Sequence, residues 1–360
     1  MRFPEFSGEW EMASLQDIAA INPKSDQLQN TFIYIDLEAV EKGELRKIQE
    51  IMREEAPSRA QRVINNNDIL FQCVRPYQKN NYIHKILNTS NQQWVASTGY
   101  AQIRTTESPN YIYHLLNTDG FNRKVMVRCT GSSYPAINSE DLATIRFYYT
   151  PDKKEQFKIS RLLDLIDERI ATQNKIIEKL QSLIKGLAVA LTTKEKANIA
   201  ISQCLECHSS TLQESEVLSS GLCKVFGANG LVGYKDVPQM NGDAILVIKD
   251  GSGVGTVSYA QGKFSVIGTL NYLTVIGNND LRYLYFALSV FNFQPYKTGM
   301  AIPHIYFKDY GKAKIYCPSL AEQKRVANVL DKLESKLFVE QELLASFNQQ
   351  KLYLLGKMFI

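Results

Sequence analysis

The sequence lacks any apolar run long enough to cross a membrane. Its longer apolar stretches, such as residues 244–248, fall far short of the roughly 18 consecutive apolar residues that a spanning helix needs. Residues 2–10 are too polar to serve as a signal peptide. The sequence therefore predicts a cytoplasmic protein with no membrane partner.

A strong charge of either sign is also missing. The chain has 41 Lys and Arg against 37 Asp and Glu, which gives a net charge of +4. Such a weak imbalance does not identify a nucleic-acid or membrane binder, so any basic face must be local. Cysteine is scarce, and the six cysteines show no framework spacing. In a chain without an export signal, this usage predicts reduced thiols.

The motifs of common enzymes are absent. The four histidines are spread along the chain and form no nucleophile-and-base pattern. Residues 251–256 resemble a phosphate-binding loop, but no Lys follows the last glycine and a strand pattern follows the turn. A glycine-bearing hairpin is the better interpretation. The sequence therefore predicts a protein that is not an enzyme.

One pair of cysteines leaves two alternatives open. Residues 204–208 read C-x-x-C-H, the pattern of haem attachment, although that chemistry belongs to exported proteins. Zinc bound by Cys204, Cys207, His208 and the distant Cys223 is a second alternative, which lacks a second paired motif. Neither alternative is favoured, and we expect no metal and no cofactor in this chain.

Internal repetition is what the sequence does have. At 360 residues, with 44% hydrophobic and 22% charged side chains, the chain is long enough for two or three ordinary domains. Residues 151–156 and 318–323 share Pro, Glu and Gln at an offset of 167, and this register persists downstream. Upstream, residues 130–137 and 298–305 both read T-G-x-x-x-P-x-I. The pattern predicts one module built twice.

Each copy ends in a long helical pattern. Apolar residues recur at alternating steps of four and three over residues 159–191 and again over 326–358, which is typical of a coiled-coil seam. The first seam is about 48 Å long at 1.5 Å per residue, which is long for a globular helix. Asp152 and Ser319, each followed three positions later by Glu, predict a capping box at both helix starts.

We expect the two long helices to pair with each other. Antiparallel packing within one chain would give a two-helix stalk with internal pseudo-two-fold symmetry. The alternative is that each helix forms a separate homodimer interface. Gln173 and Glu340 interrupt the two seams at equivalent positions, and such polar residues often set register. We therefore predict that Gln173 and Glu340 lie close together near the pseudo-axis.

The segments before the long helices have mixed strand and helix patterns. Strand patterns in the first copy occupy residues 31–35, 68–71, 94–97 and 100–103, and residues 111–116 look helical. Strand patterns in the second copy occupy residues 243–248, 255–259 and 271–276, with a turn at residues 251–253.

These patterns predict an α+β fold with two globular domains separated by two long antiparallel coiled-coil helices. The predicted boundaries are domain 1 at residues 1–150, a helix at 151–195, domain 2 at 196–317 and a helix at 318–360. Residues 192–220, rich in Lys, Ser, Glu and Cys, are interpreted as a connector into the second domain. Two similar domains on a spacer suit a ligand with two sites, and DNA half-sites roughly 34 Å apart match a stalk of this size.

Several short segments carry a family resemblance. They are Trp10-x4-Leu15-x2-Ile18, residues 56–60, residues 67–70 with Arg75-Pro76, the E-Q-x-x-I/V helix starts at Glu155 and Glu322, and residues 227–234 followed by 242–247. Their order, together with the duplication, resembles the specificity (S) subunit of type I restriction-modification systems over nearly the whole chain. The second half departs from this pattern because it has no counterpart of Trp10-x4-Leu15.

The resemblance implies two target-recognition domains, each reading one half of a bipartite site on double-stranded DNA. The conserved helical regions would act as spacer and as docking surface for two methyltransferase subunits. In such assemblies the modification subunits bind S-adenosylmethionine and methylate adenine, while restriction subunits use ATP and Mg for translocation and cleavage. This chain would hold no cofactor and would supply specificity rather than chemistry.

Loop residues that can contact bases or phosphates are candidates for DNA binding. Arg and Asn can bond to guanine and adenine edges, and Lys neutralises phosphate. The candidates in the first domain are Arg75, Tyr77, Lys79, Asn80 and Asn81, followed by Ser58, Arg59 and Arg62. The candidates in the second domain are Asn229, Tyr234, Lys235, Lys249, Ser252, Tyr296 and Lys297. The alternative for each is a solvated loop residue.

A second function fits the same architecture. A non-catalytic coiled-coil scaffold would join protein partners through its long helices and bind peptides through its globular domains. Such a scaffold would show no steep salt dependence with duplex DNA, whereas a DNA reader would.

Overall fold

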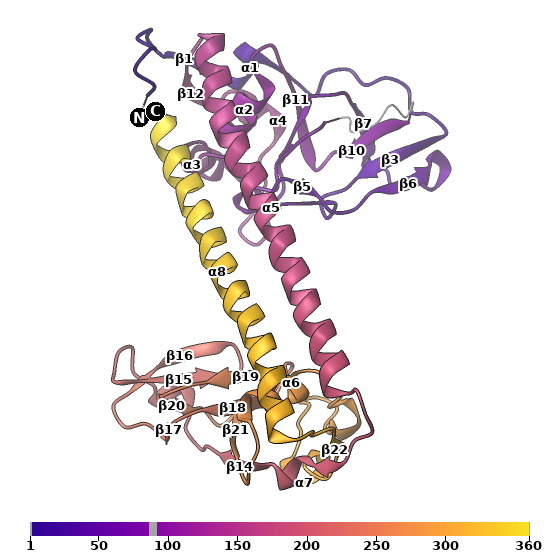
Figure 1. Ribbon diagram of the computed structural model, residues 1–360. Coiled ribbons are helices and arrows are strands. Elements are labelled where there is room, and N and C mark those ends of the chain that lie inside the picture. Colours follow the sequence, from indigo (N-terminus) through magenta and orange to yellow (C-terminus); the bar gives the residue numbers. More distant parts are fainter. Residues whose placement is uncertain (1, 86–91, 360) are drawn as a thin grey trace. The chain divides into compact units, whose positions relative to one another are not determined.

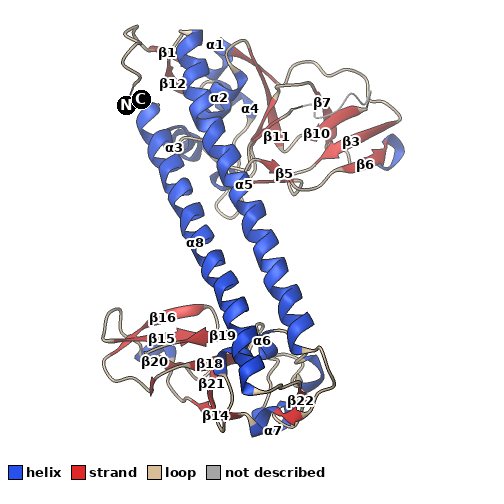
Figure 2. Ribbon diagram, viewed as in Figure 1, coloured by secondary structure: helices blue, strands red, loops and turns tan. Residues whose placement is uncertain are grey.

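The computed structural model describes residues 2–85 and 92–359. The chain divides into two compact units: unit 1 comprises residues 1–173 with 343–360, and unit 2 comprises residues 174–342. Each unit holds one globular α+β domain and a part of both long helices, α5 (Lys153–Thr192) and α8 (Leu320–Met358). Figure 1 labels these elements, and Figure 2 shows that both domains mix strands with short helices.

Two four-stranded sheets build the globular part of unit 1. One has the order β2-β11-β8-β9, and its neighbours are all antiparallel. The other has the order β6-β3-β10-β7, in which only β3 and β10 are parallel. The bounds are β2 (Ala19–Ile21), β3 (Thr31–Ile35), β6 (Gln49–Met52), β7 (Ala60–Ile64), β8 (Ile69–Gln72), β9 (Tyr82–Ile83), β10 (Gln93–Ser97) and β11 (Tyr100–Thr105).

Short strands and helices complete unit 1. Strand β1 (Glu11–Ser14) pairs with β12 (Arg146–Tyr149), and β4 (Val40–Glu41) pairs with β5 (Glu44–Leu45). The helices are α1 (Leu15–Ile18), η1 (Arg53–Glu55), η2 (Pro76–Gln78), α2 (Pro109–Leu116), α3 (Asp119–Arg128) and α4 (Ser139–Ala143).

Unit 2 repeats this topology. Its sheets have the orders β14-β21-β18-β19 and β16-β15-β20-β17, and β15 and β20 are again a parallel pair. The strands are β13 (Ile199–Ala200), β14 (Leu205–Ser209), β15 (Cys223–Gly227), β16 (Gly230–Lys235), β17 (Met240–Asn241), β18 (Ala244–Ile248), β19 (Val257–Ala260), β20 (Lys263–Val266), β21 (Leu270–Val275) and β22 (Lys314–Ile315). The helices are η3 (Ile201–Gln203), η4 (Glu214–Glu216), α6 (Leu281–Ser289), η5 (Gln294–Tyr296) and α7 (Phe307–Tyr310). The predicted strands and the predicted duplication are confirmed.

The alternation of side chains along a strand explains why each domain has more than one core. In β8, Ile69 and Phe71 face a core shared with helices α2 and α5, whereas Leu70 faces a core shared with the second sheet. In β18 of unit 2, Ile245 and Val247 face the helical core, whereas Leu246 faces the other sheet. Because both faces are covered, these strands are nearly continuous apolar runs.

The long helices pack against each other within each unit. In unit 1, Lys351 Nζ of α8 lies 2.5 Å from Asp167 Oδ1 of α5, and the last turns of α8 share a core with the first turns of α5. In unit 2, Ala188 near the end of α5 shares a core with Val326 and Leu330 near the start of α8. The helices are therefore antiparallel partners within one chain, as predicted, rather than separate homodimer interfaces.

Both seam-interrupting residues, Gln173 and Glu340, are buried. Lys336 Nζ lies 2.5 Å from Glu340 Oε1, one turn away on the same helix, so the buried carboxylate has an opposite charge beside it. That Gln173 and Glu340 lie close to each other stays a prediction.

The helix starts match only half of the capping-box prediction. Asp152 Oδ1 accepts from the Lys154 N–H at 2.8 Å and acts as the N-cap. The Glu155 carboxylate does not return to the cap, because it accepts from Arg2 Nε at 2.6 Å and from Thr150 Oγ1 at 2.6 Å. Burial raises the pKa of Glu155, but these hydrogen bonds outweigh it and leave the pKa below its ordinary value.

The interpretation of residues 192–220 as a connector is wrong. This segment contains β13, η3 and β14, and Ile201 and Leu205 are core residues. Strand β13 pairs with β22 as β1 pairs with β12, so Ile201 stands where Leu15 stands in unit 1. Unit 2 therefore has a structural counterpart of Leu15, although its sequence lacks the Trp10-x4-Leu15 motif. A two-residue strand is too short to show a periodic pattern in the sequence.

Among the described residues, no helix combines the length and apolar character that a bilayer span requires.

Candidate nucleic-acid interface

The turn after strand β8 presents Arg75 and Tyr77 at the surface of unit 1. Arg75 has a left-handed backbone, with φ of 54°, directly before η2. Its N–H donates to the Pro135 carbonyl at 2.8 Å, which ties the turn to residues 130–136. The Arg75 guanidinium lies 4.4 Å from the centre of the Tyr134 ring. Because Tyr77 is half exposed, the turn offers a cation and an aromatic ring to a ligand.

Lys79, which is predicted to contact DNA, forms an ion pair with another residue of unit 1. Its Nζ donates to Asp119 Oδ1 at 2.6 Å and to the Asn117 carbonyl at 3.2 Å. The hydrogen bond from Lys79 lowers the pKa of Asp119 below its ordinary value. The ammonium therefore links the turn to the start of α3.

Asn80 and Asn81 are engaged in the fold as well. Asn80 Oδ1 accepts from the Lys42 N–H at 3.0 Å. Asn81 is buried; its Oδ1 accepts from the Gln72 N–H at 2.9 Å and its amide donates to Asn117 Oδ1 at 3.1 Å. A DNA contact by Asn81 would break both bonds, and a role of Asn81 in DNA binding stays a prediction.

The second predicted cluster of unit 1 belongs to the other sheet. Ser58 and Arg59 are exposed in the turn before β7, where the Arg59 carbonyl accepts from the Thr98 N–H at 2.9 Å. Arg62 is half-buried within β7, and its Nε has no hydrogen-bond partner among the described residues. Burial lowers the pKa of Arg62 below its ordinary value. Only Ser58 and Arg59 of this cluster are freely accessible.

Unit 2 has an equivalent of the Arg75 turn after strand β18. Gly251 has φ of 100° and its N–H donates to the Pro303 carbonyl at 2.9 Å, as Arg75 donates to Pro135. Ser252 is exposed in this turn, and Lys249 is half-buried just before it. The turn opens the β18–β19 hairpin, so the hairpin interpretation of residues 251–256 is confirmed.

The remaining candidates of unit 2 occupy two places. Asn229 is exposed in the β15–β16 hairpin, and Tyr234 and Lys235 are half-buried in β16. Tyr296 and Lys297 are half-buried at the end of η5, and the Tyr296 ring stacks on Phe291 with 5.8 Å between ring centres. Lys297 lies directly before the loop that docks on the Gly251 turn, whereas the β15–β16 hairpin belongs to the other sheet.

Sequence reasoning missed the two loops that dock on these turns. In residues 130–136 the side chains of Ser132, Ser133 and Tyr134 are exposed, and in residues 298–304 those of Met300, Ala301 and Ile302 are exposed. The signal was visible, because both loops carry the repeated T-G-x-x-x-P-x-I motif. The two loops therefore share a backbone frame and differ in the side chains at the tip.

The cysteines and the histidine of the haem and zinc alternatives pack within unit 2. Cys204 is a core residue, and Cys223 Sγ donates to the Lys235 carbonyl at 2.9 Å. His208 stacks on Tyr272 with 4.8 Å between ring centres, and its Nε2 lies 2.8 Å from Thr274 Oγ1. Within residues 2–85 and 92–359, no three His, Cys, Asp or Glu side chains gather as a metal site would need.

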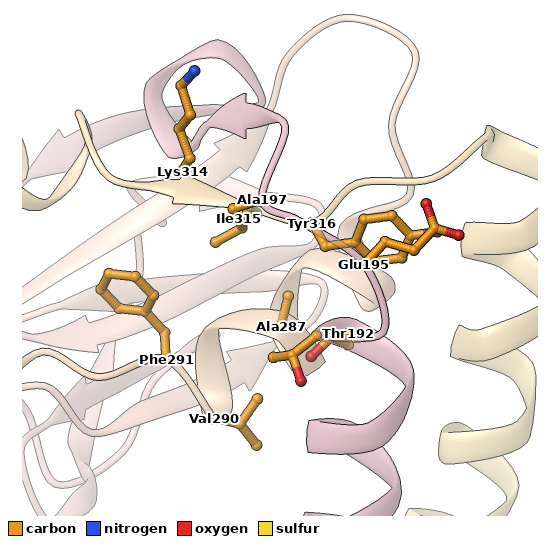
Figure 3. A pocket seen from close by; sticks show the side chains of 10 residues that line it. Thr192, Glu195, Ala197, Ala287, Val290, Phe291, Lys314, Ile315 and Tyr316 are labelled. Atoms are coloured by element: carbon orange, nitrogen blue, oxygen red, sulfur yellow. The ribbon is translucent and has the colours of Figure 1, made fainter.

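A small pocket lies in unit 2 beside the C-terminal end of α5. Its volume is about 120 Å³, and Figure 3 shows the side chains around it. Glu195 and Lys314 are the charged residues of its lining, and they point apart rather than into a common centre (Figure 3). Because its volume is well below the roughly 300 to 1,000 Å³ of typical ligand sites, the pocket is a packing gap rather than a ligand site.

Unit 1 carries an apolar groove on the outer face of α5, with a volume of about 480 Å³. Phe157 and Leu165 lie in it with 68% and 42% of their surfaces exposed, and Phe3 and Phe6 line its other side. Its lining residues are Phe3, Phe6, Lys154, Phe157, Lys158, Arg161, Leu162 and Leu165. Large apolar side chains of this kind, rimmed by cations, mark contact surfaces for other macromolecules.

The fold and the paired loops define a binding protein in which one type of domain occurs twice within one chain. The family model of the type I restriction modification DNA specificity domain matches residues 7–182 and 208–349, which include both copies. The chain therefore belongs to the family of type I restriction-modification DNA specificity proteins.

Individual relatives agree with this assignment. A region of 110 residues is 24% identical to the specificity subunit of the type I restriction enzyme EcoprrI from Escherichia coli, and covers 31% of this chain and 27% of that protein. The S subunit of a type I restriction-modification system from M. genitalium is similar with a TM-score of 0.68 and 16% identity, over 98% of this chain and 96% of that one.

A second solved chain comes from work on complex assembly and conformational transition of the type I R-M system. It is similar with a TM-score of 0.58 and 19% identity, over 97% of both chains. At these identities the two solved chains show a shared fold.

Proposed function

We propose that this chain is the sequence-specific DNA-recognition subunit of a type I restriction-modification complex. Each unit reads one half of a bipartite site on double-stranded DNA. The observation that carries the proposal is the duplication of one fold within one chain, matched over both copies by the specificity-domain family. Two unlike copies suit an asymmetric site, because each half then meets its own set of loop side chains.

The candidate residues support a ligand with bases and phosphates. The Arg75 turn combines a guanidinium with exposed aromatic rings, which suits a base edge in the major groove. Lysines lie near the equivalent turn of unit 2, where Lys249 precedes it and Lys297 precedes the docked loop. Such lysines neutralise phosphates and position the domain on the duplex.

The long helices are the proposed docking surface for two methyltransferase subunits and for restriction subunits. Helix α5 exposes Phe157 and Leu183, and helix α8 exposes Phe338 and Tyr353, all outside the cores that the helices share. Exposed apolar residues on a helix are costly in water unless a partner covers them. The groove at Phe157 is one such feature in unit 1.

The chain supplies specificity and its partners supply chemistry. We assign S-adenosylmethionine to the methyltransferase subunits, and ATP and Mg to the restriction subunits. The proposal rests on the family, whose described role is DNA specificity.

Selection of binding sites from a random duplex library tests the proposal. The full chain, purified together with the modification subunits of its host, is expected to enrich one motif with two separated halves. Mapping methylated adenines in the host genome with and without the chain should return the same motif. Enrichment of no motif, with methylation unchanged when the chain is removed, would reject the proposal.

The salt dependence of binding to duplex DNA distinguishes a DNA reader from the scaffold alternative. A DNA reader loses affinity steeply as salt rises, because each neutralised phosphate releases counterions on binding. A scaffold that binds only proteins shows no such slope with duplex DNA. The family match over both copies favours the DNA reader.

A further inference from the structure

The two units contain the same rigid seven-residue loop. In residues 130–136, the Thr130 N–H donates to the Ala136 carbonyl and the Ala136 N–H to the Thr130 carbonyl, both at 2.9 Å. In residues 298–304, Thr298 and His304 exchange the same pair of bonds at 2.9 and 2.8 Å. We name residues 130–136 and 298–304 the tip loops.

Glycine at the second position closes each tip loop. Gly131 has φ of 88° and Gly299 has φ of 86°, a conformation that other residues rarely adopt. A Cβ at Gly299 would lie 2.4 Å from the Ile302 carbonyl oxygen, and one at Gly131 would lie 3.0 Å from the Tyr134 carbonyl oxygen. The backbone of both loops is therefore determined by the shared T-G-x-x-x-P frame.

Each tip loop is anchored to the same turn of its unit by two further backbone bonds. In unit 1 they join Arg75 N–H to Pro135 and Ile137 N–H to Cys73, at 2.8 and 3.0 Å. In unit 2 they join Gly251 N–H to Pro303 and Ile305 N–H to Lys249, both at 2.9 Å. Since the anchors lie more than 50 residues away in the sequence, the position of each loop is built into the fold.

The side chains on this common frame differ completely. Ser132, Ser133 and Tyr134 of unit 1 correspond to Met300, Ala301 and Ile302 of unit 2, and all six are exposed. The residue under the loop changes too. Arg75, which stacks on Tyr134, is replaced by Gly251, whose N–H donates to Pro303 as that of Arg75 donates to Pro135.

We propose that the tip loops are specificity-determining elements and that each reads base edges of its own half-site. This inference rests on the proposed function. The polar tip of unit 1 presents hydroxyls and the Arg75 guanidinium, which match hydrogen-bonding base edges. The apolar tip of unit 2 presents Met300 and Ile302, which match the methyl group of thymine. A constant frame with different tips is what reading two unlike half-sites requires.

DNA is favoured over a protein partner by the surroundings of the unit 2 tip. The exposed Tyr306 ring lies beside His304, and Lys308 Nζ lies 5.1 Å from the centre of the Tyr306 ring. Lys297 precedes the loop on its other side. An apolar tip that two lysines flank in the sequence can approach a base edge while the lysines contact phosphates. Thymine carries the only methyl group in the major groove of unmodified DNA, so it is the apolar feature that Met300 and Ile302 can contact.

A loop exchange tests which residues read which half. The triple variant Met300→Ser, Ala301→Ser and Ile302→Tyr gives unit 2 the tip of unit 1 on an unchanged frame. In the library selection, its preference is expected to change in one half of the motif while the other half stays as in the wild type. The unchanged half is the internal control for folding and assembly. A motif identical to that of the wild type in both halves would overturn the inference.

A second test uses the wild-type chain and therefore does not depend on the folding of a variant. Each thymine of the selected motif is replaced by uracil, which lacks only the methyl group. At the thymine under the unit 2 tip, binding is expected to weaken about fourfold, the factor that burial of one methyl-sized group supplies. Equal binding of all uracil duplexes would overturn the thymine assignment.

The outcomes separate this inference from the proposed function. If the wild-type chain selects no motif, the proposed function fails. If it selects a bipartite motif that neither the loop exchange nor uracil affects, the proposed function stands and the tip loops do not read bases. Lys308→Ala adds a third readout, since loss of one phosphate contact should reduce the salt slope of binding by about one.

Discussion

Arg75 shows how a single residue links the fold to the proposed interface. Its left-handed backbone lets its N–H reach Pro135, and its guanidinium lies over the Tyr134 ring. Asn81, only six positions later, is enclosed and bonded on both sides of its amide. Neighbours in sequence therefore have different surroundings, because Arg75 is partly exposed and Asn81 is buried.

Arg75→Ala is expected to weaken binding to the cognate duplex by about 1 to 3 kcal/mol, since a base-reading guanidinium makes two bonds to guanine. Arg75→Lys should recover only part of this loss, because an ammonium cannot make the bidentate contact. Binding isotherms at fixed salt measure the effect. Arg46→Ala is the matched control, as Arg46 is an exposed arginine paired with Glu44. An Arg75→Ala isotherm that overlays the wild type would remove Arg75 from the interface.

Because His84 is buried, we predict that the stability of the protein depends on pH. The ring is fully buried against Trp94, and neither ring nitrogen has a hydrogen-bond partner among the described residues. Burial lowers the pKa of His84 to about 4, although the charge of Asp68 acts to raise it. Between pH 6.5 and 4 the unfolded chain therefore binds a proton that the folded chain does not. The free energy of unfolding falls as pH decreases through this window, by on the order of 3 kcal/mol.

Urea denaturation of His84→Phe and of the wild type at several pH values checks this. At pH 8 the difference between the two proteins reports packing alone. Below pH 6.5 the wild type should lose stability faster than the variant. Parallel curves from pH 8 to pH 4 would show that His84 is not the group responsible.

At the scale of elements, equivalent parts of the two units differ in how completely they are filled. Helix α6 of unit 2 has Ala287 where helix α2 of unit 1 has Leu115, when the helices are aligned on Tyr283 and Tyr111. Ala287 lines the pocket of about 120 Å³, whereas Leu115 is buried in the unit 1 core. The smaller side chain in the second copy accounts for the gap.

Ala287→Leu is expected to stabilise unit 2 by roughly 0.5 to 2 kcal/mol, because the added carbon atoms enter space that is already open. The reciprocal change Leu115→Ala should cost about 2 to 5 kcal/mol, as it removes a packed side chain from a closed core. Thermal melts of both variants measure the effects. A destabilised Ala287→Leu protein would show that the pocket cannot admit a leucine without strain.

At the scale of the whole molecule, the duplication gives both units the same backbone topology. Both units repeat the sheet orders, the tip loops and the helix starts, while exposed side chains diverge. The exposed apolar residues of the helices diverge as well, since Phe157 of α5 corresponds to Lys324 of α8 at the repeat offset of 167. The two docking surfaces are therefore expected to differ in composition.

Phe157→Asp is expected to reduce co-purification of modification subunits by placing a charge in the apolar groove of α5. A loss of about 2 kcal/mol or more corresponds to a residue that anchors an interface. Pull-down with a tagged chain measures it. Leu222→Asp is the control, because Leu222 is 82% exposed in the globular part of unit 2 and not on a helix. Equal recovery of partners with both variants would place the docking surface elsewhere.

Much of the fold could be predicted because its signals are local. Residues 69–71 and 244–248 are short apolar runs within strands, and the steps of four and three in α5 and α8 define their seams within each helix. The connector prediction failed at β13, where two residues pair with β22 more than 110 positions away. The sequence placed Arg75 and Ser252 among the candidate residues but not the tip loops, whose docking depends on backbone bonds between distant segments.

The sequence by itself determined that the chain is a duplicated module with two long helices and no enzyme motif, because each copy of a motif and each helical seam is defined by residues close together in the chain. The tertiary structure alone decided that residues 130–136 dock on Arg75 and residues 298–304 on Gly251, and which side chains there face solvent. Those outcomes depend on backbone bonds between distant segments, whose formation requires the packed sheets and cores around them.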